Sequence, residues 1–116
     1  MSEVQASVEV AAVQAALRAL ANPTRQRILV LLLPEPEGLS YGEIARRLGF
    51  AEPSSIDQHL KSLAFATLIG NRVGRVDGRI RSLYRISAWG REWMDRCGLA
   101  SPESKRILLR SDASRA

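Results

Sequence analysis

Apolar residues recur at helical spacing through the first third of the chain. An alanine-rich stretch has large apolar side chains three or four positions apart, which predicts a helix over residues 8–20. Asn22 is expected to cap a second helix with Pro23 in its first turn. This second helix, residues 24–33, is apolar nearly all round after its first turn, so we expect it at the centre of a small core. The spaced apolar residues of the first helix are Val10, Val13, Leu17 and Leu20.

Two helices with polar outer faces follow, joined by a short turn at residues 49–53. Ser40 and Glu43 have the spacing of a capping box, which predicts a helix from Ser40 to Leu48. Ser54 and Asp57 have related spacing and predict that the next helix opens at Ser54, within residues 54–66. At about 100° per residue this helix has one apolar and one polar side. Its apolar stripe is Ile56, Leu60 and Leu63, and its polar side carries Ser54, Gln58 and Lys61.

A β-hairpin and two further helices complete the pattern. The dipeptide Asp77-Gly78 favours a type I′ turn, so residues 70–86 predict two antiparallel strands. The alternation along the second strand is imperfect and leaves its buried face open. Ser87 is expected to cap a helix over residues 88–97. A short helix over residues 103–110 is also expected, with a disordered end after it.

The order of these elements predicts a fold class, α+β but mainly helical: a winged helix-turn-helix (ααα-turn-α-ββ-α). A length of 116 residues suits one domain. We expect residues 1–100 to form the helix-turn-helix domain with terminal helices for dimerisation. Residues 101–116 are expected to be a partly disordered C-terminal tail.

Positive charge is concentrated on the hairpin. The chain has a net charge of +5, and residues 70–86 hold five arginines against one aspartate, a local charge of +4. A patch of this kind favours double-stranded DNA as the partner. The alternative is a solvated charged edge that discourages strand aggregation. Arg46 and Arg47 either contact the DNA backbone or remain on a solvated helix face.

The candidate DNA contacts fall into two groups. Serine, glutamine and lysine side chains on the outer face of the 54–66 helix can reach base edges in the major groove. Hairpin arginines can reach phosphates or the minor groove. The first group is Ser54, Ser55, Gln58 and Lys61, and the second is Arg72, Arg75, Arg79 and Arg81.

Three stretches, in this order, resemble ArsR-type winged-helix regulators: ALANPTRQRIL at residues 19–29, QHLKSL at 58–63 and LYRIS at 83–87. The resemblance covers residues 12–97 and implies a homodimer built from the first and last helices. Ordinary core packing is the alternative role of these apolar residues. The residues expected at the dimer interface are Val13, Leu17, Trp89, Trp93 and Met94.

The chain offers few groups for metal or catalytic chemistry. Metal-sensing members of the family use cysteine pairs near the third helix or histidine and carboxylate clusters on the last helix, and neither is present. We therefore expect no metal, no cofactor and no enzyme activity. His59 is expected to be a hydrogen-bonded histidine at the core boundary, with a phosphate contact as the alternative. Cys97 is expected to be buried and inert.

The function that these patterns predict is a sequence-specific, double-stranded DNA-binding transcriptional regulator. The helix over residues 54–66 would read the major groove, and the basic wing over residues 70–86 would rest on the backbone or minor groove. The alternative is a winged-helix protein-interaction or scaffold module. One cysteine and no visible signal sequence favour a cytoplasmic, nucleoid-associated location without a membrane partner. Any small-molecule effector remains unknown from the sequence.

Overall fold

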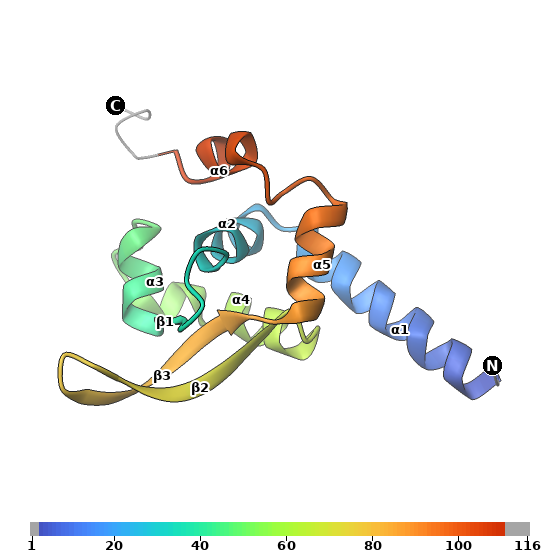
Figure 1. Cartoon of the computed structure of the whole chain (residues 1–116), viewed down its shortest axis with the longest axis horizontal. Helices are drawn as coiled ribbons and strands as arrows, with labels where there is room; N and C mark the ends of the chain where they lie inside the picture. Colours follow the sequence, from blue (N-terminus) through green and yellow to red (C-terminus); the bar gives the residue numbers. More distant parts are fainter. Residues whose placement is uncertain (1–2, 111–116) are drawn as a thin grey trace.

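Six α-helices and a small twisted sheet at the edge of the molecule make up the computed structural model of the chain, which describes residues 3–110 (Figure 1). The predicted winged helix-turn-helix is confirmed. None of the described helices is both long enough and apolar enough to cross a membrane. The elements are α1 (Glu3–Leu20), α2 (Pro23–Leu32), β1 (Leu39–Ser40), α3 (Tyr41–Arg47), the 3-10 helix η1 (Pro53–Ile56), α4 (Asp57–Phe65), β2 (Ile69–Val76), β3 (Arg79–Ile86), α5 (Ala88–Arg96) and α6 (Pro102–Leu108).

The predicted hairpin is the wing of the fold. Strands β2 and β3 pair antiparallel in a continuous register that runs from Ile69 opposite Ile86 to Val76 opposite Arg79. Asp77 and Gly78 join them with φ angles of 52° and 78°. Positive φ at both central residues is what a type I′ turn requires. The sequence did not predict β1, because two residues are too few to show alternation; it pairs with β3 and gives the sheet order β1-β3-β2.

Helix α2 lies in the middle of the core, as its apolar sequence predicts. Ile28, Leu29 and Leu32 are fully buried, and side chains from the other helices and the sheet pack around them. Asn22 caps the helix by accepting a 3.1 Å hydrogen bond from the backbone N–H of Arg25. Helices α4, α5 and α6 and strand β3 all contact α2, so the core is built around it.

Of the two capping patterns predicted for the helix-turn-helix, the one at Ser40 is confirmed and the one at Ser54 is wrong. In α3, the Ser40 hydroxyl accepts from the Glu43 backbone N–H at 3.2 Å, and the Ser40 N–H donates to Glu43 Oε1 at 3.1 Å. Ser54 does not cap α4, because it lies inside the preceding 3-10 turn and the α-helix begins only at Asp57. Asp57 instead forms an ion pair with Lys61, in which Oδ2 and Nζ are 2.9 Å apart.

The predicted short helix near the C-terminus is confirmed as α6, which packs against α2. Arg27 on α2 donates from Nε to the Leu108 carbonyl at 2.9 Å and from Nη2 to the Leu48 carbonyl at 3.2 Å. These carbonyls belong to the ends of α6 and α3, where helices lack partners of their own. Residues 111–116, for which disorder was predicted, lie outside the described residues.

Candidate nucleic-acid interface

The polar side of η1 and α4 faces solvent. Leu60 and Leu63 on the opposite side are buried and hold the helix on the core. Lys61 stays charged, because its hydrogen bond to Asp57 and the charge of that carboxylate raise the pKa of the lysine. The structure thus presents the whole predicted base-reading set on an accessible surface. The exposed members are Ser54, Ser55, Gln58 and Lys61.

His59 lies on the flank of α4, partly buried at the core boundary as predicted. Its Nδ1 atom is buried and has no hydrogen-bond partner in the described part of the chain, so the expected hydrogen-bonded histidine is wrong in that respect. Burial lowers the pKa of His59, and the nearby positive charge of Arg25 lowers it further. A histidine in this setting is neutral at pH 7 and adds no charge to the interface.

The wing arginines differ in what they contact. Arg72 is held by Glu37: its Nη2 forms an ion pair with the carboxylate, and its Nε donates to the backbone carbonyl at 3.2 Å. Arg75 is exposed and lies within 3.5 Å of the Gly78 carbonyl at the turn. Arg79 and Arg81 are exposed, and neither has an ion pair with a described residue. The free positive charge of the wing therefore lies near its tip and along β3.

Arg46 adds to this charge, whereas Arg47 does not. Arg47 is 3.1 Å from Glu35 Oε1 and 3.9 Å from Glu43 Oε2. Arg46 has no ion pair among the residues that the structure describes, and it lines a groove of about 820 Å³ between α3 and the wing. Arg79 and Arg81 line the same groove, in which the carboxylates are those of Glu43 and Asp77. Three arginines from two elements thus converge beside the helix-turn-helix.

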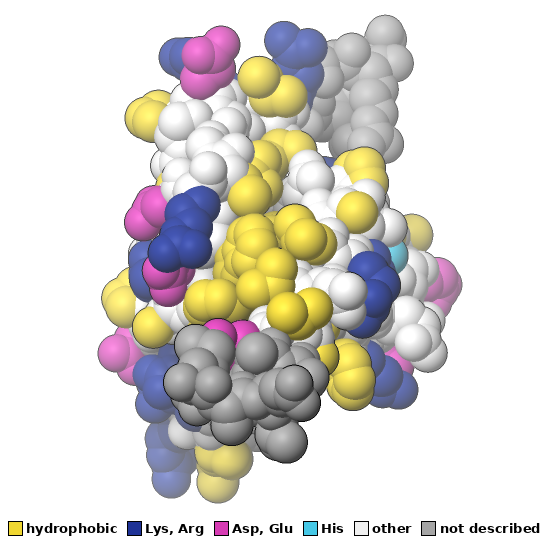
Figure 2. Space-filling view, turned by 90° about the vertical axis from the view of Figure 1, so that its right-hand side faces the viewer, with side chains coloured by type: hydrophobic (Ala, Val, Ile, Leu, Met, Phe, Trp, Pro, Cys, Tyr) yellow, Lys and Arg dark blue, Asp and Glu magenta, His cyan; other side chains and the backbone are white. Residues whose placement is uncertain are grey.

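All but one of the predicted dimer residues are at least partly exposed. Figure 2 looks onto the end of the molecule from which α1 projects, and apolar side chains gather at its centre. Val13 and Leu17 on α1 are 37% and 51% exposed. Trp89 and Trp93 on α5 are half-buried and meet edge to face, with ring centroids 5.7 Å apart. Met94 is fully buried in the protomer's own core, so its assignment to the interface is wrong.

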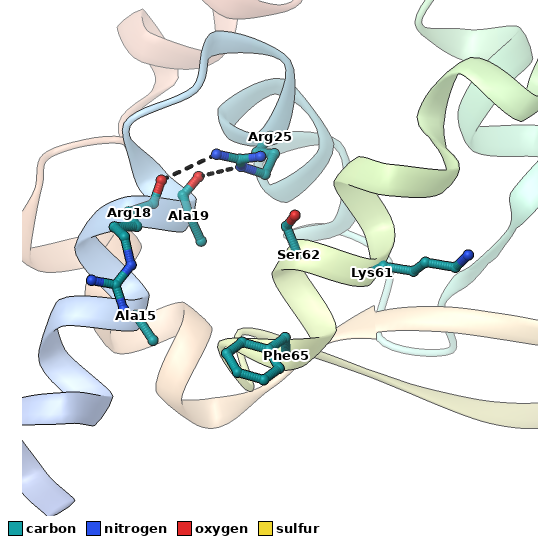
Figure 3. Close-up of a pocket in the computed structure, with 7 residues that line it drawn as sticks. All are labelled: Ala15, Arg18, Ala19, Arg25, Lys61, Ser62 and Phe65. Atoms are coloured by element: carbon teal, nitrogen blue, oxygen red, sulfur yellow. Dashed lines mark hydrogen bonds between the residues drawn. The ribbon is translucent and has the colours of Figure 1, made fainter.

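Sequence reasoning missed Phe65, an aromatic residue at the end of α4 with 83% of its surface exposed. It lines a cavity with residues of α1 and the first turn of α2 (Figure 3). Its position is readable in retrospect, because at about 100° per residue Phe65 lies on the side of α4 opposite Leu60 and Leu63. An apolar residue outside the apolar stripe of a helix was the signal.

The described residues give no support for a metal centre or a buried thiol. No three His, Cys, Asp or Glu side chains within them are close enough to hold a metal ion. The single cysteine, Cys97, is exposed at the end of α5, so its expected burial is wrong. Cys97 follows the last residue of α5, and the side chain that this helix buries near its end is Met94.

Comparison with known proteins agrees with this geometry. Residues 20–69 match a family model described as a helix-turn-helix domain, which spans α2 through the start of β2. No curated protein sequence matches the chain. The match and the winged-helix fold agree with the predicted resemblance to ArsR-type winged-helix regulators.

Solved structures of bacterial proteins have the same fold. HlyU from Vibrio cholerae is 28% identical with a TM-score of 0.62, over 77% of this chain and 90% of that chain. Rv0081 from M. tuberculosis is 28% identical with a TM-score of 0.54, over 91% of this chain and 99% of that chain. A third is the homodimeric winged helix-turn-helix DNA-binding domain of Mb0332 from Mycobacterium bovis, described as a possible ArsR-family transcriptional regulator. It is 23% identical with a TM-score of 0.69, over 92% and 93% of the two chains.

Proposed function

Because the chain has a helix-turn-helix domain within an ArsR-type winged-helix fold, we propose that it is a sequence-specific, double-stranded DNA-binding transcriptional regulator. The helix-turn-helix match and the regulators among its structural neighbours support DNA binding. The observation that carries the proposal is a set of arginines that have no ion pair with a described residue and that line one groove between α3 and the wing. These arginines are Arg46, Arg79 and Arg81.

In the proposed mode of binding, α4 lies in the major groove. Ser54, Ser55 and Gln58 can exchange hydrogen bonds with base edges, and Lys61 can reach a guanine or a phosphate. Glutamine is well suited to adenine, whose N6 and N7 match its amide. The wing would rest on the flanking backbone or minor groove, where arginines contribute affinity with little sequence preference.

We propose that two protomers bind together through α1 and α5. A single winged helix reads one half-site, and a symmetric dimer doubles the contact area on a palindromic operator. The exposed apolar side chains of Val13 and Leu17 on α1 and the half-buried rings of Trp89 and Trp93 on α5 favour these two helices. The structural neighbour from Mycobacterium bovis is described as homodimeric, which supports a dimer but does not identify its interface.

The competing function is a protein-interaction or scaffold module. It would use the same fold without reading a base sequence. Wing arginines that have no ion pair with a described residue argue against it, because a scaffold has no need for such a positive surface. The two functions differ in whether one duplex is preferred over others.

Selection of bound duplexes from a random pool, followed by anisotropy titration, tests the proposal. We expect the selected duplex to bind about 10³-fold or more tightly than a scrambled one of equal length. Gln58→Ala should cost about 1–3 kcal/mol per half-site on the selected duplex and leave the scrambled duplex unaffected. Equal affinity for all duplexes would favour the scaffold function, and equal losses on both duplexes would show that α4 does not read the sequence.

A further inference from the structure

A cavity of about 440 Å³ opens between α1, the first turn of α2 and α4. Figure 3 shows it bordered by the ends of α1 and α4, with Arg25 on one side and Phe65 on the other. A volume of this size suits a small organic ligand. The residues that line it are Ala15, Arg18, Ala19, Arg25, Lys61, Ser62 and Phe65.

One wall of the cavity is apolar and aromatic. Phe65 is 83% exposed, and the side chains of Ala15 and Ala19 leave room beside its ring. Leaving a phenylalanine ring in water forgoes about 2 kcal/mol of burial. A planar ring that stacks on Phe65 would recover part of this free energy and add the preference of aromatic pairs for offset stacking.

The charge of the cavity has one sign. Every ionisable side chain in its lining is a cation: Arg18, Arg25 and Lys61. Lys61 is turned away from the cavity in Figure 3, toward Asp57 at 2.9 Å, so it contributes its aliphatic stem and a general positive field. Arg18 and Arg25 are the other two cations. The lining contains no carboxylate that would compete with an anionic ligand for them.

Arg25 is fixed in position by the end of α1. Its Nε donates to the Ala19 carbonyl at 2.7 Å and its Nη2 to the Arg18 carbonyl at 3.1 Å. A guanidinium has more N–H donors than these two bonds use. Because the side chain is already ordered, little rotamer entropy would be lost when its remaining donors bind a carboxylate.

The cavity is separate from the proposed dimer surface. At about 100° per residue, the mean direction of Ala15, Arg18 and Ala19 differs by about 170° from that of Val13 and Leu17. A partner protomer docked on one side of α1 would therefore leave the other side open. The occupant we assign to this cavity is a small molecule rather than a second copy of the chain.

We propose that this cavity binds a small aromatic carboxylate. The ring would stack on Phe65 against the alanines of α1, and the carboxylate would accept hydrogen bonds from Arg25 and the Ser62 hydroxyl. If the protein binds DNA as proposed, this cavity would act as an effector site. The ligand's negative charge lies beside α4, so its binding weakens DNA binding, and DNA weakens ligand binding by the same factor.

The first measurement is calorimetry of the DNA-free protein with 2-naphthoate, using 2-naphthamide as the uncharged control. We expect naphthoate to bind at one site per chain and the amide to bind about tenfold or more weakly, since hydrogen bonds to a charged group are about twice as strong. Phe65→Ala should remove most of the affinity, and Phe65→Trp should restore it. Ile107→Ala, which shortens a 66% exposed apolar side chain on α6, is the matched control and should bind as the unaltered protein does.

The second measurement is DNA affinity with and without saturating naphthoate. We expect a loss of about fivefold or more, and no loss in Phe65→Ala. No naphthoate binding, equal binding of the amide, or binding that survives Phe65→Ala overturns the proposed site. Naphthoate that competes with DNA equally in Phe65→Ala would place the anion on the DNA-binding surface and also overturn it. A protein that binds naphthoate but no duplex would refute the regulator function alone.

Discussion

Among the wing arginines, the neighbouring carboxylate determines what each can contribute to DNA binding. Glu37 holds Arg72, whereas Arg79 has no ion pair with a described residue. To bind Arg72, a DNA phosphate would have to displace Glu37 and would then lie close to the negative charge of that carboxylate. The sequence alone could not separate these two arginines, because Glu37 is far from Arg72 along the chain.

The contrast gives a prediction about salt dependence. Arg79→Ala should weaken binding to all duplexes alike and reduce the slope of log K against log salt by about 1 per subunit. Arg72→Ala should change the slope less, and Glu37→Gln should strengthen binding by freeing Arg72. Anisotropy titrations over a range of salt concentrations measure all three. Equal effects of Arg72→Ala and Arg79→Ala would show that the Glu37 ion pair does not persist on DNA.

His59 predicts a dependence of folding stability on pH. Burial and the charge of Arg25 lower its pKa in the folded state below the ordinary 6.5. The unfolded chain therefore takes up the proton first as the pH falls, so the free energy of unfolding decreases from pH 6.5 down through the folded-state pKa. Urea unfolding of the unaltered protein and of His59→Gln between pH 7.5 and 5 is the test, and this loss should be absent from the variant, to within about 0.5 kcal/mol. An identical loss in both proteins would assign the pH dependence to carboxyl groups.

At the scale of elements, the attachment of α5 to the sheet depends on one close approach. The Ser87 hydroxyl donates to the Thr67 carbonyl at 2.7 Å and accepts from the Gly90 N–H at 2.9 Å. A Cβ atom on Gly90 would lie 2.2 Å from the Leu68 carbonyl oxygen, which is backbone and cannot yield easily. Only glycine fits at this contact.

Gly90→Ala should therefore lower the free energy of unfolding by about 1–3 kcal/mol. Gly42 on α3 supplies the control, because a Cβ there meets nothing within 4 Å. Gly42→Ala should stabilise the protein by about 0.5–1 kcal/mol through helix propensity. Thermal or urea unfolding compares the pair. A Gly90→Ala protein as stable as Gly42→Ala would mean that α5 is not held in this position.

Helix α1 gives the test of dimerisation. Leu17 is 51% exposed in the protomer, so Leu17→Glu should leave the fold intact while placing a charge in the proposed interface. Light scattering should show a dimer for the unaltered protein and a folded monomer for Leu17→Glu. Ile107→Glu, at a comparably exposed apolar site on α6, should remain dimeric. A dimer that survives Leu17→Glu contradicts the α1 and α5 surface.

The elements that the sequence predicted well carry their signals locally. The Asp77-Gly78 turn, the Ser40–Glu43 box and the Asn22-Pro23 start each lie within a few residues, and each is confirmed. The start of α4 was predicted wrongly because Ser54 and Asp57 fit a capping pattern, while the backbone first forms a 3-10 turn. Strand β1 and the Arg27 contacts depend on residues distant in sequence, and no local pattern reports them.

For the molecule as a whole, the candidate site was predictable in type and less so in detail. Helical angles placed the polar face of α4 outward, and the arginine count located the wing. They did not show that Arg46 shares a groove with Arg79 and Arg81, or that Phe65 borders a cavity. Those features arise where separate elements meet, so they became visible only in the assembled fold.

The central claim is that a dimer binds DNA phosphates through arginines on the wing and α3 that have no ion pair with a described residue. The most direct measurement is the dependence of duplex affinity on salt concentration. If each of two subunits neutralises about three to five phosphates, the slope of log K against log salt should lie on the order of −5 to −9. A slope near zero, or no binding to any duplex at low salt, would contradict it.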